Sequence, residues 1–305
     1  MSRARKNDNP SGLQGILVVD KPAGWTSFDV LAKLRGVLST RGLGHSGTLD
    51  PMATGVLPVF VGGARKAVDL QQNHDKTYLA TLKLGVATDT GDTTGEVLRT
   101  AEVTVGEAEL LAVLPRFAGE QMQLPPMYSA VKVNGQPLYK AARKGVEVER
   151  QPRPITVYSI EYRGRGEGEH EYLLEIACSK GTYVRVLLED IGAALGLPAT
   201  MSGLRRLKAG VYDLSGSHTL EEIYAAKGSG TLAGLLLPTD TVFGHLPALR
   251  VDEATRARLM NGAPTYRFRA KDGRYRVYGP EAEFLGLANL EEQVLKVEKL
   301  FVERG

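Results

Sequence analysis

The sequence contains little cysteine and no long hydrophobic run, and each absence restricts what the protein can be. Cys178 is the only cysteine among 305 residues, which excludes an intramolecular disulfide and a cysteine-built zinc site. No apolar stretch approaches the roughly 18 residues that a membrane-spanning helix requires. The first residues are polar and basic and lack the apolar core of a signal peptide. We therefore expect a cytoplasmic protein with no membrane partner.

Cofactor-binding motifs are absent as well. No Gly-x-Gly-x-x-Gly follows an apolar run, and residues 62–66 lack the spacing of a phosphate-binding loop. Residues 44–48 do not form a nucleophile elbow, because the second glycine comes one place early. We expect no cofactor and no metal. Any chemistry must come from ordinary side chains, chiefly a carboxylate supported by tyrosine and arginine.

Charge is balanced over the whole chain but not along it. The net charge is +3, whereas residues 132–154 alone carry six basic and two acidic side chains. The basic positions are Lys132, Lys140, Arg143, Lys144, Arg150 and Arg153. A basic stripe on a balanced protein is typical of contact with a nucleic-acid backbone. A solvated loop would have the same composition, so charge alone leaves both interpretations open.

Length and composition predict one large domain and a smaller one. Residues 1–12 are expected to be a disordered basic tail, and 13–245 to form the main domain. A Gly- and Pro-rich passage precedes 246–305, where one short helix and several short strands are predicted. In the main domain the apolar patterns predict strands at 15–20, 56–60, 76–84, 155–162, 171–179 and 204–211, and helices at 27–39, 107–117 and 219–226.

Tyr78 lies in the segment with the clearest alternation. It shares one face of the predicted strand with Ala80, Leu82 and Leu84, so its ring points to the apolar side. A core tyrosine with a satisfied hydroxyl is the commoner explanation of that pattern. Farther along the chain, residues 180–185 lead into another predicted helix. If residues 183–185 are still extended, the side chains of Tyr183 and Arg185 point the same way.

Asp50 is the carboxylate that we single out. It lies in a loop from Gly44 to Gly55, and Pro51 disfavours helical backbone at the residue before it. The apolar run that follows predicts a buried strand, and a carboxylate on a loop beside a rigid element is a common catalytic arrangement. An aspartate in a Gly-rich loop is more often only a turn former.

This loop strongly resembles the signature of the TruB family of tRNA pseudouridine synthases. Its residues are Gly44-His45-Ser46-Gly47-Thr48-Leu49-Asp50-Pro51-Met52-Ala53-Thr54-Gly55. Further blocks similar to the family's follow in the family's order at 20–22, 76–78, 126–130, 153–158, 179–185 and 204–206. The resemblance covers about residues 15–214. One departure is at 46–48, where many members carry Thr-Gly-Ala or Thr-Gly-Thr; we expect no functional consequence.

The resemblance implies that the protein isomerises uridine 55 in the T loop of tRNA to pseudouridine. The N1–C1′ bond breaks, the uracil rotates, and C5 bonds to C1′. Asp50 matches the catalytic aspartate, which attacks either C6 of the base or C1′ of the ribose, and the sequence does not choose between them. Arg185 matches the arginine that pairs with it, and we expect this guanidinium to lower the pKa of the Asp50 carboxyl.

A flipped-out uridine accounts for the remaining implied roles. Tyr78 resembles the tyrosine that stacks on the base and acts in proton removal, and Tyr183 and Leu204 resemble further walls of the uracil pocket. His45 resembles the residue that fills the vacated position in the RNA loop, and Lys21 matches a family lysine with a structural or phosphate-directed role. For the RNA backbone we assign Lys132, Arg143, Lys144, Arg150 and Arg153.

The fold implied by the resemblance is α+β, with a mixed, largely antiparallel sheet and an active-site cleft across it. Residues 124–152 correspond to an inserted segment that clamps the T arm and is missing from guide-RNA-dependent relatives. We therefore expect a tRNA partner and no guide RNA. The segment 246–305 is similar in position and size to a PUA-like RNA-binding module. Nothing in the sequence demands more than a monomer.

Three other functions compete with this interpretation. The main alternative is an RNA-binding or tRNA-folding protein whose catalysis is secondary or lost; the presence of both Asp50 and Arg185 argues against it. A guided synthase for ribosomal or small RNA is disfavoured by the insertion at 124–152. A base-excising glycosidase more often uses two carboxylates and a water, and it would release free uracil.

Overall fold

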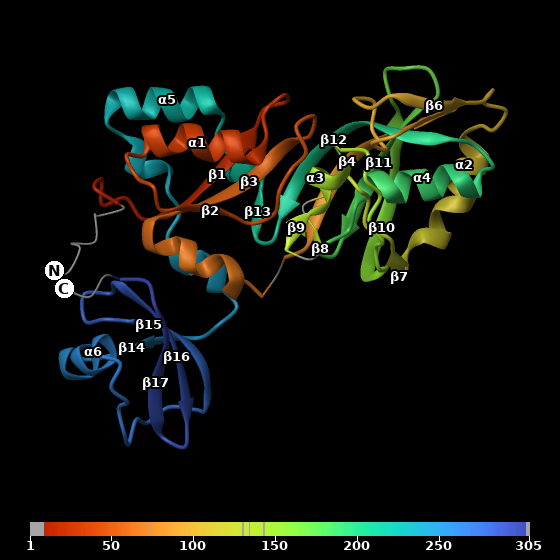
Figure 1. Ribbon diagram of the computed structural model, residues 1–305. Coiled ribbons are helices and arrows are strands. Elements are labelled where there is room, and N and C mark those ends of the chain that lie inside the picture. The colour runs from red at the N-terminus through yellow and green to blue at the C-terminus, as the bar shows by residue number, and fades with distance from the viewer. Residues whose placement is uncertain (1–8, 73, 130, 134, 143, 303–305) are drawn as a thin grey trace.

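A mixed sheet forms the centre of the molecule in the computed structural model, which describes residues 9–302 except 73, 130, 134 and 143 (Figure 1). Within these residues the sheet has nine strands. Their main order is β1 (Gly15–Lys21), β3 (Thr54–Val61), β12 (Ala199–Ala209), β4 (Lys76–Leu84), β11 (Glu171–Cys178), β10 (Arg153–Arg165) and β7 (Gly119–Gln123). β2 (Leu43–His45) pairs with β3, and β13 (Tyr212–Asp213) pairs with β12. Among the neighbouring strands described in this sheet, β3 and β12 are the one parallel pair, so the predicted mixed, largely antiparallel sheet is confirmed.

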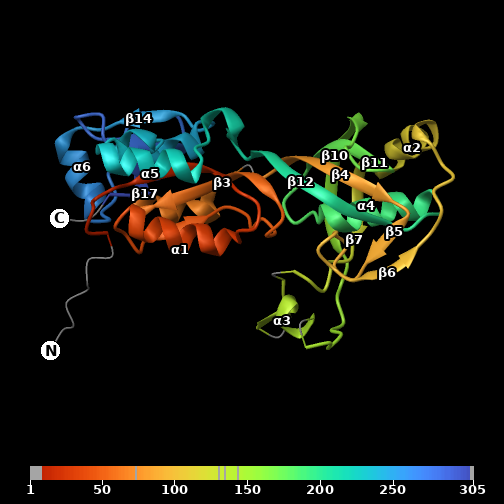
Figure 2. The same ribbon diagram turned by 90° about the horizontal axis from the view of Figure 1, so that it is seen from above.

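Helices cover the two halves of this sheet separately. Over β1 and β3, α1 (Ser27–Val37) and α5 (Leu220–Ser229) lie side by side and bury their apolar faces (Figures 1 and 2). A second core joins β4, β10, β11 and β12 to α2 (Glu107–Val113) and α4 (Val184–Ala194). Short 3₁₀ turns are η1 (Gly62–Leu70), η2 (Leu114–Phe117), η3 (Leu214–Gly216), η4 (Leu232–Leu235) and η5 (Thr239–Phe243).

Apolar alternation on β4 is confirmed: positions 78, 80, 82 and 84 are buried, and those between them are partly exposed. Cys178, at the end of β11, lies in the same core and is a free thiol. No helix of the described part of the chain is long and apolar enough to cross a membrane. Residues 1–8 of the predicted disordered tail lie outside the described residues.

The long strand β12 connects the two halves, as Figure 2 shows. On one side it pairs antiparallel with β4, and on the other its Arg205 and Arg206 pair in parallel with Thr54 and Gly55. The parallel contact lies where the Gly-rich loop ends and β3 begins. The loop carrying Asp50 is therefore fixed at the seam between the two halves of the sheet.

Gly55 is required at this seam. Its φ of +100° is unfavourable for residues with a side chain, and an added Cβ would lie 2.2 Å from the Arg206 carbonyl oxygen. We expect Gly55→Ala to lower the free energy of unfolding by about 3 kcal/mol, measured by urea denaturation. Gly164→Ala is the control, because Gly164 has a φ of +117° but no atom within 4 Å of an added Cβ. Equal losses in both variants would show that the contact with β12 is unimportant.

Two smaller units extend from the main sheet. Within the predicted insertion, the hairpin of β8 (Lys132–Val133) and β9 (Gln136–Pro137) leads into α3 (Leu138–Ala142), and α3 projects away from the sheet (Figure 2). β5 (Val86–Thr88) and β6 (Val97–Thr100) form a separate hairpin.

The C-terminal unit is small and mostly β, as predicted. Its sheet has the order β14 (Ala248–Arg250), β15 (Gly273–Tyr278), β16 (Phe284–Glu291) and β17 (Val294–Leu300), with α6 (Glu253–Met260) beside it. It has its own core and contacts the main sheet through aromatic rings. Phe301 is fully buried between Phe243 and Phe284, with ring centroids 5.6 and 5.5 Å away.

Candidate active site

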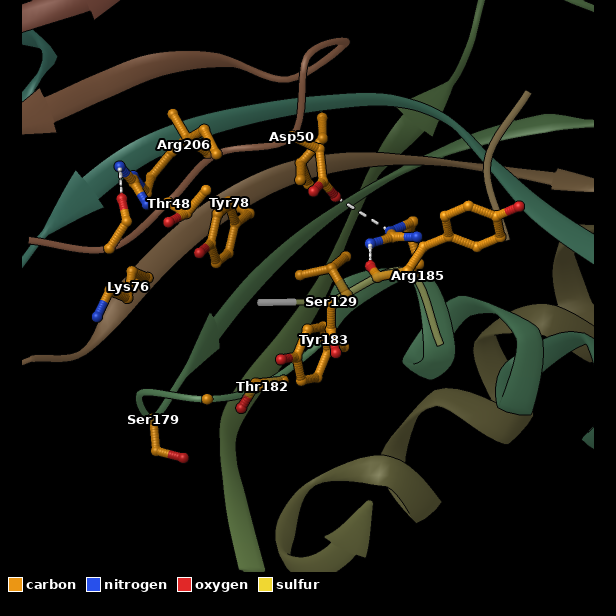
Figure 3. A pocket seen from close by; sticks show the side chains of 16 residues that line it. Thr48, Asp50, Lys76, Tyr78, Ser129, Ser179, Thr182, Tyr183, Arg185 and Arg206 are labelled. Atoms are coloured by element: carbon orange, nitrogen blue, oxygen red, sulfur yellow. Dashed lines mark hydrogen bonds and ion pairs between the residues drawn. The ribbon is translucent and has the colours of Figure 1, made fainter. Parts of the chain in front are cut away.

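A pocket of about 270 Å³ lies at the seam of the sheet (Figure 3). Its walls come from the Gly-rich loop, the first residues of β4, the middle of β12, the segment between β11 and α4, the start of α4 and the base of the insertion. The lining residues are Gly47, Thr48, Leu49, Asp50, Lys76, Tyr78, Tyr128, Ser129, Ser179, Gly181, Thr182, Tyr183, Val184, Arg185, Leu204 and Arg206. The pocket brings together Asp50, Tyr78, Tyr183, Arg185 and Leu204, five of the residues selected from the sequence.

Asp50 and Arg185 form an ion pair in this pocket, 3.1 Å from Nε to Oδ2. The guanidinium is held by two further bonds: Nη1 donates to the carbonyl of Thr90 at 2.6 Å and Nη2 to that of Tyr128 at 2.8 Å. The Arg185 side chain is only 6% exposed, whereas the Asp50 side chain is 37% exposed. The arginine is thus a fixed, buried support, and the carboxylate faces the open space.

Burial raises the pKa of the Asp50 carboxyl, and Arg185 only partly opposes that shift. The net shift in the pKa of Asp50 is therefore upward. The guanidinium does act as anticipated, but removing a carboxylate from water costs more than the ion pair returns. A second carboxylate near Arg185, that of Asp92, raises the pKa of Asp50 further.

Asp92 also lies beside Arg185, although the sequence analysis assigned it no role. Its side chain is 8% exposed, and Oδ2 lies 3.9 Å from Nε of Arg185. The other oxygen, Oδ1, accepts hydrogen bonds from the hydroxyl of Thr90 and from the backbone and hydroxyl of Thr94. Asp92 and Asp50 therefore share one guanidinium. No spacing in the sequence could reveal this, because the contact is made by distant loops.

The pH dependence of catalysis tests this arrangement. If Asp50 must be ionised, activity rises with pH through its raised pKa and is lost as pH falls below it. Asp92→Asn removes a negative charge and keeps the Oδ1 acceptor, so we expect the acidic limb of kcat/KM against pH to move to lower pH. An acidic limb that stays at the same pH or moves to higher pH would contradict the interpretation that Asp50 and Asp92 share the Arg185 guanidinium.

Tyr78 forms one wall of the pocket from β4, where it pairs with Ile176 on β11 and Arg206 on β12. It is 8% exposed, and burial raises the pKa of its phenol. The phenolate is therefore scarcely populated near neutral pH, which favours a stacking or donor role over that of a free base.

Tyr183 and Arg185 reach the pocket from the start of a helix and not from an extended segment, the conformation considered from the sequence. Tyr183 is the extended N-cap of α4, and the helix begins at Val184, so 183–185 is not one extended segment. Gln123 fixes this junction, because its Oε1 accepts from the Tyr183 backbone N–H at 2.7 Å and its Nε2 donates to the Tyr183 carbonyl at 3.1 Å. Leu204 enters from β12, opposite Ala80.

Lys21 and His45 do not line the pocket. Lys21 is fully buried, and its ammonium donates to the carbonyls of Pro22, Trp25 and Pro51. These three bonds use all its donors and tie the start of α1 to the Asp50 loop, which favours the structural alternative over the phosphate-directed one. His45 lies half-buried in β2, where burial lowers its pKa and favours the neutral ring.

The proposed backbone contacts differ in environment. The side chains of Lys144 and Arg153 are exposed. Arg150 instead donates to the Pro125 carbonyl at 3.2 Å and lies 3.5 Å from a carboxylate oxygen of Glu147, so it is partly engaged in holding the insertion together. Lys132 belongs to β8, and Arg143 lies outside the described residues.

The pocket is also lined by Lys76, Arg206 and the insertion residues Tyr128 and Ser129, none of which was assigned a role from the sequence. A signal for Lys76 was available, because it lies two residues before Tyr78 and so shares its face of the strand. Among the described residues, no group of three or more His, Cys, Asp or Glu side chains could hold a metal ion.

Comparisons with known proteins agree over most of the chain. Residues 35–184 match the N-terminal domain of the TruB family of pseudouridylate synthases, and 185–244 match a tRNA pseudouridylate synthase B C-terminal domain. The tRNA pseudouridine synthase B of Pseudomonas fluorescens Pf-5 is 43% identical, covering 96% of this chain and 95% of that protein. That of Dechloromonas aromatica is 44% identical, covering 90% and 91% respectively.

Solved structures give the same fold at lower identity. A Cbf5-Nop10-Gar1 complex contains a chain with a TM-score of 0.70 and 26% identity, covering 96% of this chain and 86% of that one. An H/ACA RNP bound to a substrate RNA contains another with a TM-score of 0.70 and 25% identity, covering 95% and 86%.

Proposed function

The chain belongs to the TruB family of pseudouridylate synthases, and from this we propose that it converts uridine 55 in the T loop of tRNA to pseudouridine. Its high identity to tRNA pseudouridine synthases B over nearly all of both chains supports the reaction and the substrate. The single structural observation that carries the proposal is the Asp50–Arg185 ion pair beside Tyr78 in an open pocket.

The chemistry begins with the target uridine flipped out of the RNA loop into the pocket, at a cost of a few kcal/mol. Asp50 then forms a bond to C6 of the uracil or to C1′ of the ribose; both routes fit its exposed oxygen. The N1–C1′ bond breaks, the ring rotates, and a C5–C1′ bond forms. C5 then loses its proton, N1 gains one, and the carboxylate is released.

The surrounding residues have distinct roles in this proposal. Arg185 orients the Asp50 carboxylate and favours its ionised form against burial. Tyr78 stacks on the base, and Tyr183 and Leu204 close the remaining walls. His45 contacts the RNA loop and not the flipped base, since it lies beyond the pocket lining.

We further propose that the enzyme acts in the cytoplasm, as a monomer and without a guide RNA. The similar chains in the Cbf5 complexes share its fold at 25–26% identity. Here the inserted segment contributes Tyr128 and Ser129 to the pocket itself, which links the clamp to the catalytic groups. A tRNA-folding protein with lost catalysis is disfavoured by the intact Asp50–Arg185 pair.

The decisive test is tritium release from 5-tritiated uridine in a T-arm stem–loop. The wild-type enzyme should release one tritium per target uridine and leave the RNA chain unbroken, with unrelated stem–loops as controls. No release would overturn the proposal. Release accompanied by free uracil would identify a glycosidase instead.

The basic insertion should contribute to RNA affinity through phosphate contacts. We expect the double charge reversal of Arg143 and Lys144 to glutamate to weaken binding at least about tenfold and to flatten the log–log salt slope by about two. Filter binding at several salt concentrations measures both. The matched control reverses Lys33 and Lys227, on the outer helices α1 and α5. An unchanged slope would exclude this part of the insertion from the interface.

A further inference from the structure

Arg206 is a buried cation with an unused donor in the pocket. It is 0% exposed; its Nε donates to the Val56 carbonyl at 2.6 Å and its Nη2 to the Gly47 carbonyl at 3.1 Å. Among the described residues its Nη1 has no hydrogen-bond partner, although Arg206 lines the pocket. Burial lowers the pKa of the guanidinium, and the nearby Tyr78 hydroxyl only partly opposes that shift. A buried donor without a partner is costly, so this atom requires an explanation.

Lys76 lies at the same end of the pocket. Its ammonium donates to the His74 carbonyl, and Lys76 shares a face of β4 with Tyr78, which pairs with Arg206 across the sheet. A Cβ added to Gly47 would lie 3.4 Å from Nη1 of Arg206 and 3.8 Å from Nζ of Lys76. The two cationic groups therefore flank one point, which the missing side chain of Gly47 leaves open.

Of the described residues that line the pocket, Asp50 is the one carboxylate, and none lines the end that holds Lys76 and Arg206. Among the described residues neither Lys76 nor Arg206 forms an ion pair, and Asp50 is committed to Arg185. Burial and the nearby Arg206 lower the pKa of Lys76 to about 8, and the attraction of Asp75 does not offset this. The exposed Lys180 adds further positive charge. Two neighbouring cations whose charge the Asp75 carboxylate does not offset favour an anion over a neutral carbonyl group.

We propose that Lys76 and Arg206 form a phosphate subsite that holds one of the two backbone phosphates flanking the flipped nucleotide. This rests on the proposed function, since phosphates are the anions that tRNA offers. Figure 3 shows the two cations on one side of Tyr78 and the Asp50–Arg185 pair on the other. During the reaction the uracil leaves C1′ and rotates, so a grip on the phosphate keeps the ribose facing Asp50 throughout.

Stem–loops with a single neutral methylphosphonate, either 5′ or 3′ of the target uridine, test the subsite. At one of these positions the modification should lower wild-type single-turnover kcat/KM by about tenfold or more, and Lys76→Met should cost a similar factor on unmodified RNA. The two losses should not multiply when combined, because they remove the same contact. The control is Lys83→Met, on the same strand but paired with Glu171, whose effect should multiply with that of the modified RNA.

Two results would overturn the subsite. The first is that neither methylphosphonate lowers kcat/KM. The second is that, at both positions, the loss from the methylphosphonate and the loss from Lys76→Met multiply fully when the two changes are combined. The latter would assign Lys76 and Arg206 to the base or to the fold. Arg206→Lys provides a second variant because it keeps the positive charge. A neutral replacement would leave the Val56 and Gly47 carbonyls without their donor. Conversion of unmodified RNA by the wild type tests the function separately, so the two failures are distinguishable.

Discussion

Replacing Asp50 by asparagine is expected to lower the rate of isomerisation at least about 10⁴-fold and to change RNA affinity less than about tenfold. An amide of the same shape keeps an oxygen for Arg185 but cannot act as the nucleophile. Binding should persist, because phosphate contacts dominate RNA affinity. Single-turnover tritium release and filter binding on the same T-arm stem–loop measure the two quantities.

The control for this variant is Asp213→Asn, because Asp213 caps the short turn η3 and does not line the pocket. It should retain wild-type rates. A rate loss in Asp50→Asn that is matched by an equal loss of affinity would assign Asp50 to RNA binding. Undiminished tritium release would remove it from the chemistry altogether.

Local patterns in the sequence were sufficient to predict the scaffold of this site. Alternation correctly predicted the buried face of β4, and apolar spacing predicted a helix at 27–39 where α1 forms. The resemblance selected the five pocket residues, but their convergence depends on the β3–β12 parallel contact, which has no local signal. The helix after residues 180–185 was predicted, but its start at Val184 was left open, because the apolar residues there suit either a strand or a helix.

The electrostatics of the pocket could not be predicted from the residues alone. A guanidinium next to a carboxylate suggests a lowered pKa, but the sign depends on how far both are removed from water. For Asp50 burial prevails, and Asp92 adds to it from a loop more than 40 positions away. The unpaired charge of Arg206 is likewise a property of the fold, because its neighbours Val56, Gly47 and Tyr78 come from separate segments.

Removing the guanidinium should be the second most damaging change in the site. Arg185→Met leaves two carboxylates, those of Asp50 and Asp92, near each other with no cation between them. The pKa of Asp50 then rises further, because the opposing charge is gone while burial and repulsion remain. We expect kcat to fall about 10³-fold near neutral pH, or about 4 kcal/mol in the activation free energy. Single-turnover rates across pH measure this.

Arg185→Lys separates the role of charge from that of shape. One ammonium cannot reach Asp50 while also replacing the bonds to the Thr90 and Tyr128 carbonyls, so we expect a loss intermediate between wild type and Arg185→Met. The acidic limb of its pH–rate profile should lie at lower pH than that of the methionine variant, because the lysine retains the positive charge that lowers the pKa of Asp50. Arg163→Met, which removes an exposed arginine paired with Glu161 and Glu175, is the control. If methionine and lysine were equally active, with identical acidic limbs, Arg185 would act only by packing.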